Sequence, residues 1–177
     1  MLPKLTLVIG GAASGKSAFA ERLVTQTARP RRYIATAQVL DAEMQARADR
    51  HRARRDTGWT TVEAPLDTAA ALHDTTRDEI VLLDCATLWL TNQMLSGNDP
   101  ATETARLLRA LKTAPAPVVV VSNEVGSGIV PENALSRRFR DEQGRLNQRL
   151  AAQAGLVVTV IAGLPLVLKG VLPEGAA

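Results

Sequence analysis

The segment GGAASGKS at residues 10–17 directly follows the apolar run LTLVI at residues 5–9. It fits the pattern G-x-x-x-x-G-K-[ST] of a phosphate-binding P-loop, in which glycines let several backbone N–H groups point at one anion. In such a loop Lys16 reaches the β- and γ-phosphates, and Ser17 offers its hydroxyl to Mg²⁺. Residues 18–23 favour a helix, whose positive N-terminal end would face the phosphates. This order predicts a nucleotide site rather than a glycine turn with a solvated lysine.

The composition fits one globular domain spanning residues 1–177. Aromatic residues are only 3% of the chain, so we expect a core of Val, Leu, Ile and Ala. The formal net charge of +3 is too small to indicate nucleic-acid binding by itself, and we predict no such partner.

The sequence shows no signal for export or membrane insertion. Cys85 is the single cysteine, which excludes an internal disulfide and is consistent with a reducing compartment. No apolar run is long enough for a membrane span, and residues 1–4 do not resemble a signal peptide. We therefore expect a cytoplasmic protein.

Short apolar runs alternate with helix-forming segments along the chain. Their apolar residues are continuous rather than alternating, which is typical of parallel strands covered on both faces. This predicts an α/β fold with a mostly parallel sheet flanked by helices. The predicted strands are 5–9, 32–36, 80–84, 117–121, 156–161 and 166–168, and the predicted helices are 16–28, 41–55, 101–113 and 133–153.

Several polar residues stand where predicted strands end. Ligands of open α/β sheets gather at the carboxyl ends of the strands. Thr36, Asp84 and the pair at 123–124 should therefore lie at the same edge as the P-loop. A carboxylate in the position of Asp84 often supports Mg²⁺ beside the P-loop hydroxyl. The alternative is a strand-end aspartate that caps the following turn.

The predicted helix 41–55 is rich in arginine around one histidine. Arg47, Arg54 and Arg55 share the face of His51, at i−4, i+3 and i+4. Nearby positive charge would keep the imidazole neutral and nucleophilic, and the guanidinium groups could hold a triphosphate against it. A histidine that attacks phosphorus forms a phosphoramidate and splits one transfer into two steps. Spacing alone favours the simpler alternative, a solvated basic helix with an incidental histidine.

A glycine-bearing loop at residues 122–131 precedes the predicted helix 133–153. The helix has an apolar stripe and an opposite polar face that contains Gly144. A glycine inside a helix costs about 1 kcal/mol relative to alanine, so it suggests close approach of another chain segment or a ligand. An ordinary solvated face remains the alternative.

Four strings carry a resemblance to a known family. They are GGAASGKSAFAE (10–21), YIATAQVLDAEMQARADRHRARR (33–55), LLDCATLWLTN (82–92) and SNEVGSGIVPENALSRRFRDEQGRLNQRLA (122–151). Together they resemble the bifunctional adenosylcobinamide kinase / adenosylcobinamide-phosphate guanylyltransferase family of cobalamin biosynthesis. The P-loop alone would indicate only a superfamily.

The resemblance implies a P-loop NTPase fold related to RecA-like cores and a homo-oligomer, a trimer in the family. It implies that ATP or GTP phosphorylates adenosylcobinamide, and that GTP then donates GMP to the adenosylcobinamide phosphate. It implies that a histidine at the position of His51 carries GMP, with Lys16 also catalytic. The implied nucleotide-binding residues are Gly10, Gly11, Ala12, Ala13, Ser14, Gly15, Lys16, Ser17, Ile34, Ala35, Thr36, Arg52, Ala53, Arg54, Arg55, Glu63 and Asp84, with Ser17 and Asp84 holding Mg²⁺.

Two departures and two alternatives accompany this interpretation. Many relatives have arginine where this chain has Ala13, which removes one positive charge from the P-loop, and the usual proline after the arginine-rich stretch is Asp56 here. The first alternative is a small-molecule P-loop kinase without a covalent intermediate, which leaves HRARR (51–55) and NEVGSGIVPEN (123–133) unexplained. The second is a nucleotide-switched binding protein, which predicts partner binding that changes with the nucleotide.

Overall fold

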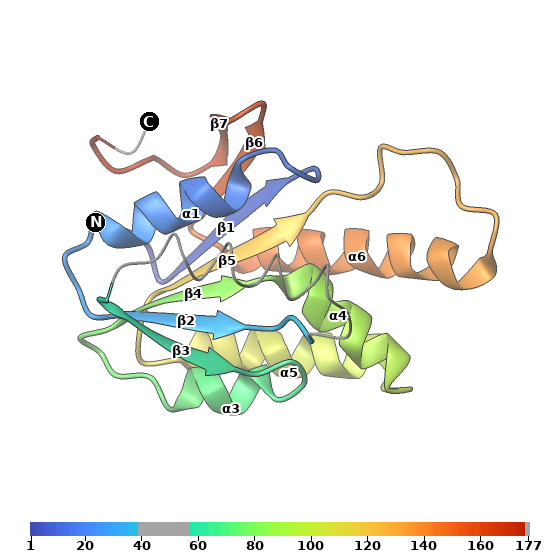
Figure 1. The fold of residues 1–177 in the computed structure, drawn as a ribbon, viewed down its shortest axis with the longest axis horizontal. Coiled ribbons are helices and arrows are strands. Elements are labelled where there is room, and N and C mark those ends of the chain that lie inside the picture. Colours follow the sequence, from blue (N-terminus) through green and yellow to red (C-terminus); the bar gives the residue numbers. More distant parts are fainter. Residues whose placement is uncertain (39–56, 176–177) are drawn as a thin grey trace.

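Residues 1–38 and 57–175 are described by a computed structural model. They form a seven-stranded sheet in the order β3-β2-β4-β5-β1-β6-β7 (Figure 1). The strands are β1 (Leu5–Gly10), β2 (Arg31–Ala35), β3 (Trp59–Glu63), β4 (Ile80–Asp84), β5 (Val118–Asn123), β6 (Leu156–Ile161) and β7 (Leu164–Lys169). The helices are α1 (Lys16–Thr25), α3 (Thr68–His73), α4 (Ala86–Leu95), α5 (Pro100–Thr113) and α6 (Ala134–Gln153).

The sheet is parallel except for β7, which pairs antiparallel with β6. Its two faces have separate apolar cores. On one face α1 inserts Phe19 and Leu23 against β1, β4 and β5. On the other face α3, α4, α5 and α6 pack, with Trp89 and Leu111 fully buried. The predicted α/β class with a mostly parallel sheet is confirmed.

Three elements were missed by the sequence analysis. The edge strand β3 has only Trp59 and Val62 partly buried, so its apolar signal is weak. The helix α3 has six residues, too few to show a helical period. The helix α4 buries the polar Asn92 and Gln93, whose side-chain amides donate to loop carbonyls, so no simple apolar stripe marks it. The predicted helix 41–55 lies outside the described residues.

The parallel register places the strand ends at one edge, as predicted. Gly10 of β1 pairs with Asn123 of β5, and Asp84 of β4 pairs with Val121 of β5. Ala35 of β2 stands beside Asp84, one residue before Thr36. Figure 1 shows α4 and the N-terminal part of α6 extending beyond this same edge. The P-loop, the loop after β5 and both helices therefore surround the carboxyl end of the sheet.

In the described ranges, no helix is both long enough and apolar enough to cross a membrane.

Candidate functional site

The P-loop backbone has a shape that requires two of its glycines. A Cβ on Gly10 would lie 2.4 Å from Ser14 Oγ and 2.7 Å from the carbonyl oxygen of Val160. Gly15 has a φ of 93°, and its Cβ would lie 3.1 Å from the Cα of Gly163. Residues with a side chain rarely adopt that φ. Glycine is therefore needed at position 15 both for the backbone conformation and for the close packing against Gly163.

Lys16 begins α1 and turns back onto the loop. Its Nζ donates to the carbonyl oxygen of Gly11 at 3.0 Å, and the residue is 9% exposed. The N-cap residue of α1, Gly15, has no side chain to accept from the first N–H groups. Helix N–H groups left without a side-chain cap and an adjacent ammonium both favour an anion, which is the arrangement that binds nucleotide phosphates.

Two backbone hydrogen bonds fix the P-loop to neighbouring segments. The N–H of Gly163, in the β6–β7 turn, donates to Ser14 O at 2.8 Å. The N–H of Glu124, just after β5, donates to Gly10 O at 3.0 Å. Ala13 has a φ of 55° in the exposed tip of the loop, a backbone conformation that residues with a side chain rarely adopt. The loop conformation is thus set by two parts of the chain distant in sequence.

Asp84 ends β4 half-buried, with one oxygen already engaged. The hydroxyl of Tyr33 donates to Asp84 Oδ2 at 3.2 Å. Ser17, in the first turn of α1, is also half-buried. Among residues 1–38 and 57–175 no group of three or more His, Cys, Asp and Glu side chains could hold a metal. Mg²⁺ in nucleotide sites needs only one or two protein oxygens beside the phosphates and water, so Ser17 and Asp84 fit that donor set.

Cys85 follows Asp84 and is inert as a nucleophile. Burial, and to a smaller extent the negative charge of Asp84, raise the pKa of its thiol to about 12, while the ammonium of Lys16 acts in the opposite direction. Because the thiolate is the nucleophilic form, a buried thiol with this pKa does not react at neutral pH. The charges of Asp84 and Lys16 thus both act on the pKa of the Cys85 thiol, in opposite directions.

Thr36 connects the ends of β2 and β4 rather than presenting a free hydroxyl. Its Oγ1 donates to the carbonyl oxygen of Cys85 and accepts from the Cys85 N–H, each at 2.8 Å. The side-chain amide of Asn92 donates to Thr36 O at 2.7 Å and to Pro65 O at 3.0 Å. These contacts connect the segments that follow β2, β3 and β4. The spacing of residues in the sequence could not have revealed this supporting function of Thr36.

The other residues in and near β2 that the family resemblance implies as nucleotide-binding occupy different environments. Ile34 is fully buried, and its side chain belongs to the core beneath α3, α4 and α5. Ala35 is half-buried beside Asp84. Glu63 ends the edge strand β3 with an exposed side chain, opposite Ala35 in register. The structure therefore brings Ala35, Glu63 and Asp84 to one edge, whereas the side chain of Ile34 faces away into the core.

The end of β5 lies between the P-loop strand and Asp84, and a buried polar network holds it. The Ser122 hydroxyl donates to Asn147 Oδ1 at 2.6 Å, and Gln143 Nε2 donates to Ser122 Oγ at 2.9 Å. Asn147 Nδ2 donates to the carbonyl oxygen of Asn123 at 3.0 Å. The sequence analysis selected neither Gln143 nor Asn147 as a site residue. The signal that could have found them is the pair of polar positions four apart on α6, at 143 and 147, which lie on one side of the helix and are buried.

No described segment approaches Gly144 closely. A Cβ built there would meet no atom within 4 Å outside the backbone of its own helix. The prediction that another chain segment approaches Gly144 closely is therefore wrong for the described residues.

The remaining predicted site residues, His51, Arg52, Ala53, Arg54 and Arg55, lie outside the described residues.

Comparison with known proteins identifies close relatives over nearly the whole chain. A family model described as cobinamide kinase / cobinamide phosphate guanyltransferase matches residues 6–168. The bifunctional adenosylcobalamin biosynthesis protein CobP of Pseudomonas aeruginosa is 46% identical over 93% of this chain and 96% of its own length. The proteins CobU of Salmonella typhimurium and Escherichia coli, described in the same words, are 44% and 42% identical, each over 93% of this chain and 99% of their own length.

Solved structures with low identity share the fold. The RadB recombinase superposes with a TM-score of 0.52 at 17% identity, covering 89% of this chain and 74% of the recombinase. A protein of Pyrococcus horikoshii OT3 gives a TM-score of 0.54 at 10% identity, over 98% of this chain and 89% of its own. These similarities show that the chain shares its fold with both proteins.

Proposed function

The chain belongs to the cobinamide kinase / cobinamide phosphate guanyltransferase family, and on that premise we propose that it phosphorylates adenosylcobinamide and then transfers GMP to the product through a covalent histidine intermediate. The observation that carries the nucleotide chemistry is the P-loop, with Lys16 at the N-terminus of α1. The match to the family supports the assignment of a cobinamide as the substrate. The proposed second step depends on His51, which the sequence analysis selected by resemblance.

Nucleotide phosphates bind against the backbone N–H groups of the P-loop. Lys16 leaves the carbonyl oxygen of Gly11 and turns its ammonium to the β- and γ-phosphates. Ser17 and Asp84 would hold Mg²⁺ through their oxygens, and the hydroxyl of Tyr33, which donates to Asp84, would orient the carboxylate. Bound there, the cation would neutralise charge on the phosphates.

In the first reaction the aminopropanol hydroxyl of adenosylcobinamide attacks the γ-phosphorus of ATP or GTP. A bond forms between the hydroxyl oxygen and phosphorus, and the bond to the β–γ bridging oxygen breaks, so that a nucleoside diphosphate leaves. Lys16 stabilises the charge that develops on the phosphate oxygens, which is the main contribution of a P-loop to such a transfer. Glu124 follows β5 at the same edge of the sheet as the P-loop, and its carboxylate accepts the proton of the attacking hydroxyl.

In the second reaction His51 attacks the α-phosphorus of GTP. A nitrogen–phosphorus bond forms, the α–β bridging bond breaks, and pyrophosphate leaves. A phosphate oxygen of adenosylcobinamide phosphate then attacks the same phosphorus and releases the imidazole, giving adenosylcobinamide-GDP. The arginines at 52, 54 and 55 contribute positive charge to the triphosphate.

One labelling experiment tests this proposal. The protein is incubated with GTP labelled at the α-phosphate, denatured in base, and digested to locate the label by mass spectrometry. We expect acid-labile label on the peptide containing His51 and none in His51→Ala. His73→Ala is the matched control, because the chain has two histidines and His73 lies in the short helix α3.

The outcomes separate the two reactions. The variant His51→Ala should still convert adenosylcobinamide to its phosphate, because that step uses the P-loop. Label that persists in His51→Ala, or full second-step turnover without any adduct, overturns the histidine intermediate. Absence of corrinoid turnover in the unaltered protein overturns the proposed substrate.

A further inference from the structure

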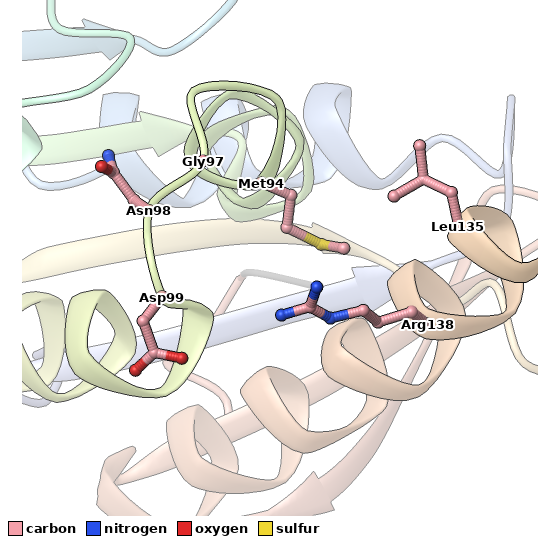
Figure 2. Close-up of a pocket in the computed structure, with 6 residues that line it drawn as sticks. All are labelled: Met94, Gly97, Asn98, Asp99, Leu135 and Arg138. Carbon is pink, nitrogen blue, oxygen red and sulfur yellow. The ribbon is translucent and has the colours of Figure 1, made fainter.

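A pocket lies between the end of α4 and the first turns of α6, with a volume of about 240 Å³ (Figure 2). Its wall also includes the turn that joins α4 to α5. The lining residues are Met94, Gly97, Asn98, Asp99, Leu135 and Arg138. Neither the nucleotide site nor the supporting network after β5 uses any of them.

The pocket stands at the same edge of the sheet as the P-loop. Helix α4 begins directly after Asp84 and Cys85, and Met94 is nine residues beyond Cys85. At 1.5 Å per residue, the pocket is about 14 Å along α4 from the end of β4. The other wall, α6, follows the loop that leaves the end of β5. Both walls therefore extend from segments that border the proposed phosphate site, and Figure 1 shows both beyond the sheet edge.

The pocket offers one cation and one anion close together. Arg138 reaches from α6 toward α4 and Asp99 (Figure 2), and it forms no hydrogen bond or ion pair with any described residue. Hydrogen bonds from Thr102 lower the pKa of Asp99, and the charge of Arg138 adds a smaller effect in the same direction. Asp99 is therefore ionised at neutral pH. The two charges balance, so the pocket has no excess positive charge to select a phosphate.

The rest of the lining is suited to an apolar ligand with amide groups. Met94 is half-buried and Leu135 is 55% exposed, so both present apolar surface to an incoming group. A primary amide donates to a carboxylate and accepts from a guanidinium, and can engage both charges without ionising. A corrin ring carries methyl groups and primary amide side chains around its edge, which matches this combination.

We propose that the pocket formed by Met94, Asp99, Leu135 and Arg138 binds one edge of the corrin ring of cobinamide, while the aminopropanol arm extends to the nucleotide phosphates. This inference rests on the proposed function and adds a place for the large part of the substrate. Because the pocket lies about 14 Å along α4 from the end of β4, the ring can stay outside the phosphate site while its arm enters it.

The test measures equilibrium binding of adenosylcobinamide by titration calorimetry, and binding of GTP in parallel. Two variants remove one charge each while retaining most of the local structure. Arg138→Met keeps the aliphatic stem, and Asp99→Asn keeps a side-chain oxygen for the N-terminus of α5. We expect each to weaken cobinamide binding about tenfold, the typical effect of losing a charge-assisted hydrogen bond, and to leave GTP affinity unchanged. Arg145→Met is the control, on the same helix but paired with Glu142 away from the pocket.

Each outcome supports or overturns the assignment. Weaker cobinamide binding in both variants, with the control unchanged, supports it. Unchanged cobinamide affinity in both variants overturns the pocket while leaving the proposed function intact. A changed sedimentation coefficient with unchanged cobinamide affinity also overturns it, because the exposed Leu95, Ile129 and Val130 nearby would then belong to a contact between copies. If the unaltered protein binds no adenosylcobinamide, the proposed function itself is wrong.

Discussion

The Nζ atom of Lys16 lies 3.0 Å from the carbonyl oxygen of Gly11, so the phosphate-binding ammonium is held by the loop that it serves. This contact gives the ammonium of a largely buried side chain a hydrogen-bond acceptor within the loop. A phosphate oxygen carries negative charge, so it attracts the ammonium more strongly than the neutral carbonyl oxygen of Gly11 does. We therefore expect a bound phosphate to replace Gly11 as the acceptor of Lys16.

Replacing Lys16 with alanine should abolish cobinamide phosphorylation. The loss removes a donor aimed at the charge that develops on the phosphates, and such losses reduce turnover by about 10²–10³-fold. Turnover is measured with ATP and adenosylcobinamide, and folding is checked by circular dichroism. Lys112→Ala, in the last turn of α5, is the control and should retain full activity. Undiminished phosphorylation by Lys16→Ala would show that the kinase site lies elsewhere.

The glycines of the P-loop should differ sharply in their tolerance of alanine. In Gly10→Ala the new Cβ would lie 2.4 Å from Ser14 Oγ and 2.7 Å from Val160 O, so the loop or β6 must shift. In Gly11→Ala the Cβ would meet nothing within 4 Å. We expect loss of about 1–3 kcal/mol of unfolding free energy together with weakened GTP binding in the first variant, and little change in the second. Urea denaturation and GTP titration measure both; equal behaviour of the two variants would contradict the loop geometry.

The sequence analysis succeeded where a local pattern corresponds to one physical cause. The P-loop motif and the continuous apolar runs of β1, β4 and β5 predicted the sheet and its functional edge, because motif and burial follow directly from residue type. It failed at α4, since buried Asn92 and Gln93 are stabilised by loop carbonyls that only the folded chain brings near. The same limit applies to Thr36: its place after β2 predicted the functional edge, whereas the hydrogen bonds between its hydroxyl and the backbone of Cys85 are visible only in the folded chain.

The hydrogen bond from Tyr33 to Asp84 should tune the response to magnesium. In Tyr33→Phe the carboxylate keeps its charge but loses one orienting donor at 3.2 Å. We expect the Mg²⁺ concentration for half-maximal phosphorylation to rise a few-fold with little change in the maximal rate. In Asp84→Asn we expect a larger loss that excess Mg²⁺ only partly restores, and chelation by EDTA should stop turnover in every variant. An unchanged magnesium curve in Asp84→Asn would exclude this carboxylate from the metal site.

The buried thiol of Cys85 should make stability fall at alkaline pH. Burial raises its folded-state pKa to about 12 from the ordinary thiol value of 9.0, so the folded protein holds the proton more tightly than the unfolded chain. The contribution is complete below about pH 9 and is lost as pH rises from 9 toward 12, with a limiting slope of about 1.4 kcal/mol per pH unit. The difference in unfolding free energy between Cys85→Ala and the unaltered protein should shrink over this range. A pH-independent difference would contradict the shift.

Replacing Gly144 with alanine should change the stability of the protein without changing its ligand binding. The residue lies inside α6, where glycine costs backbone entropy, and an added Cβ would meet no atom within 4 Å outside its own helix. Gly144→Ala should therefore raise the unfolding free energy by about 0.5–1 kcal/mol, the usual gain for this exchange in a helix. Because nothing described approaches this position, the affinities for GTP and adenosylcobinamide should not change. Chemical denaturation measures the gain, and Gly97→Ala serves as a contrasting control because its φ of 77° opposes any side chain even though the space is open. A stabilised protein that has lost cobinamide binding would mean that the substrate itself approaches the helix here, and that the glycine was retained for contact with the ligand.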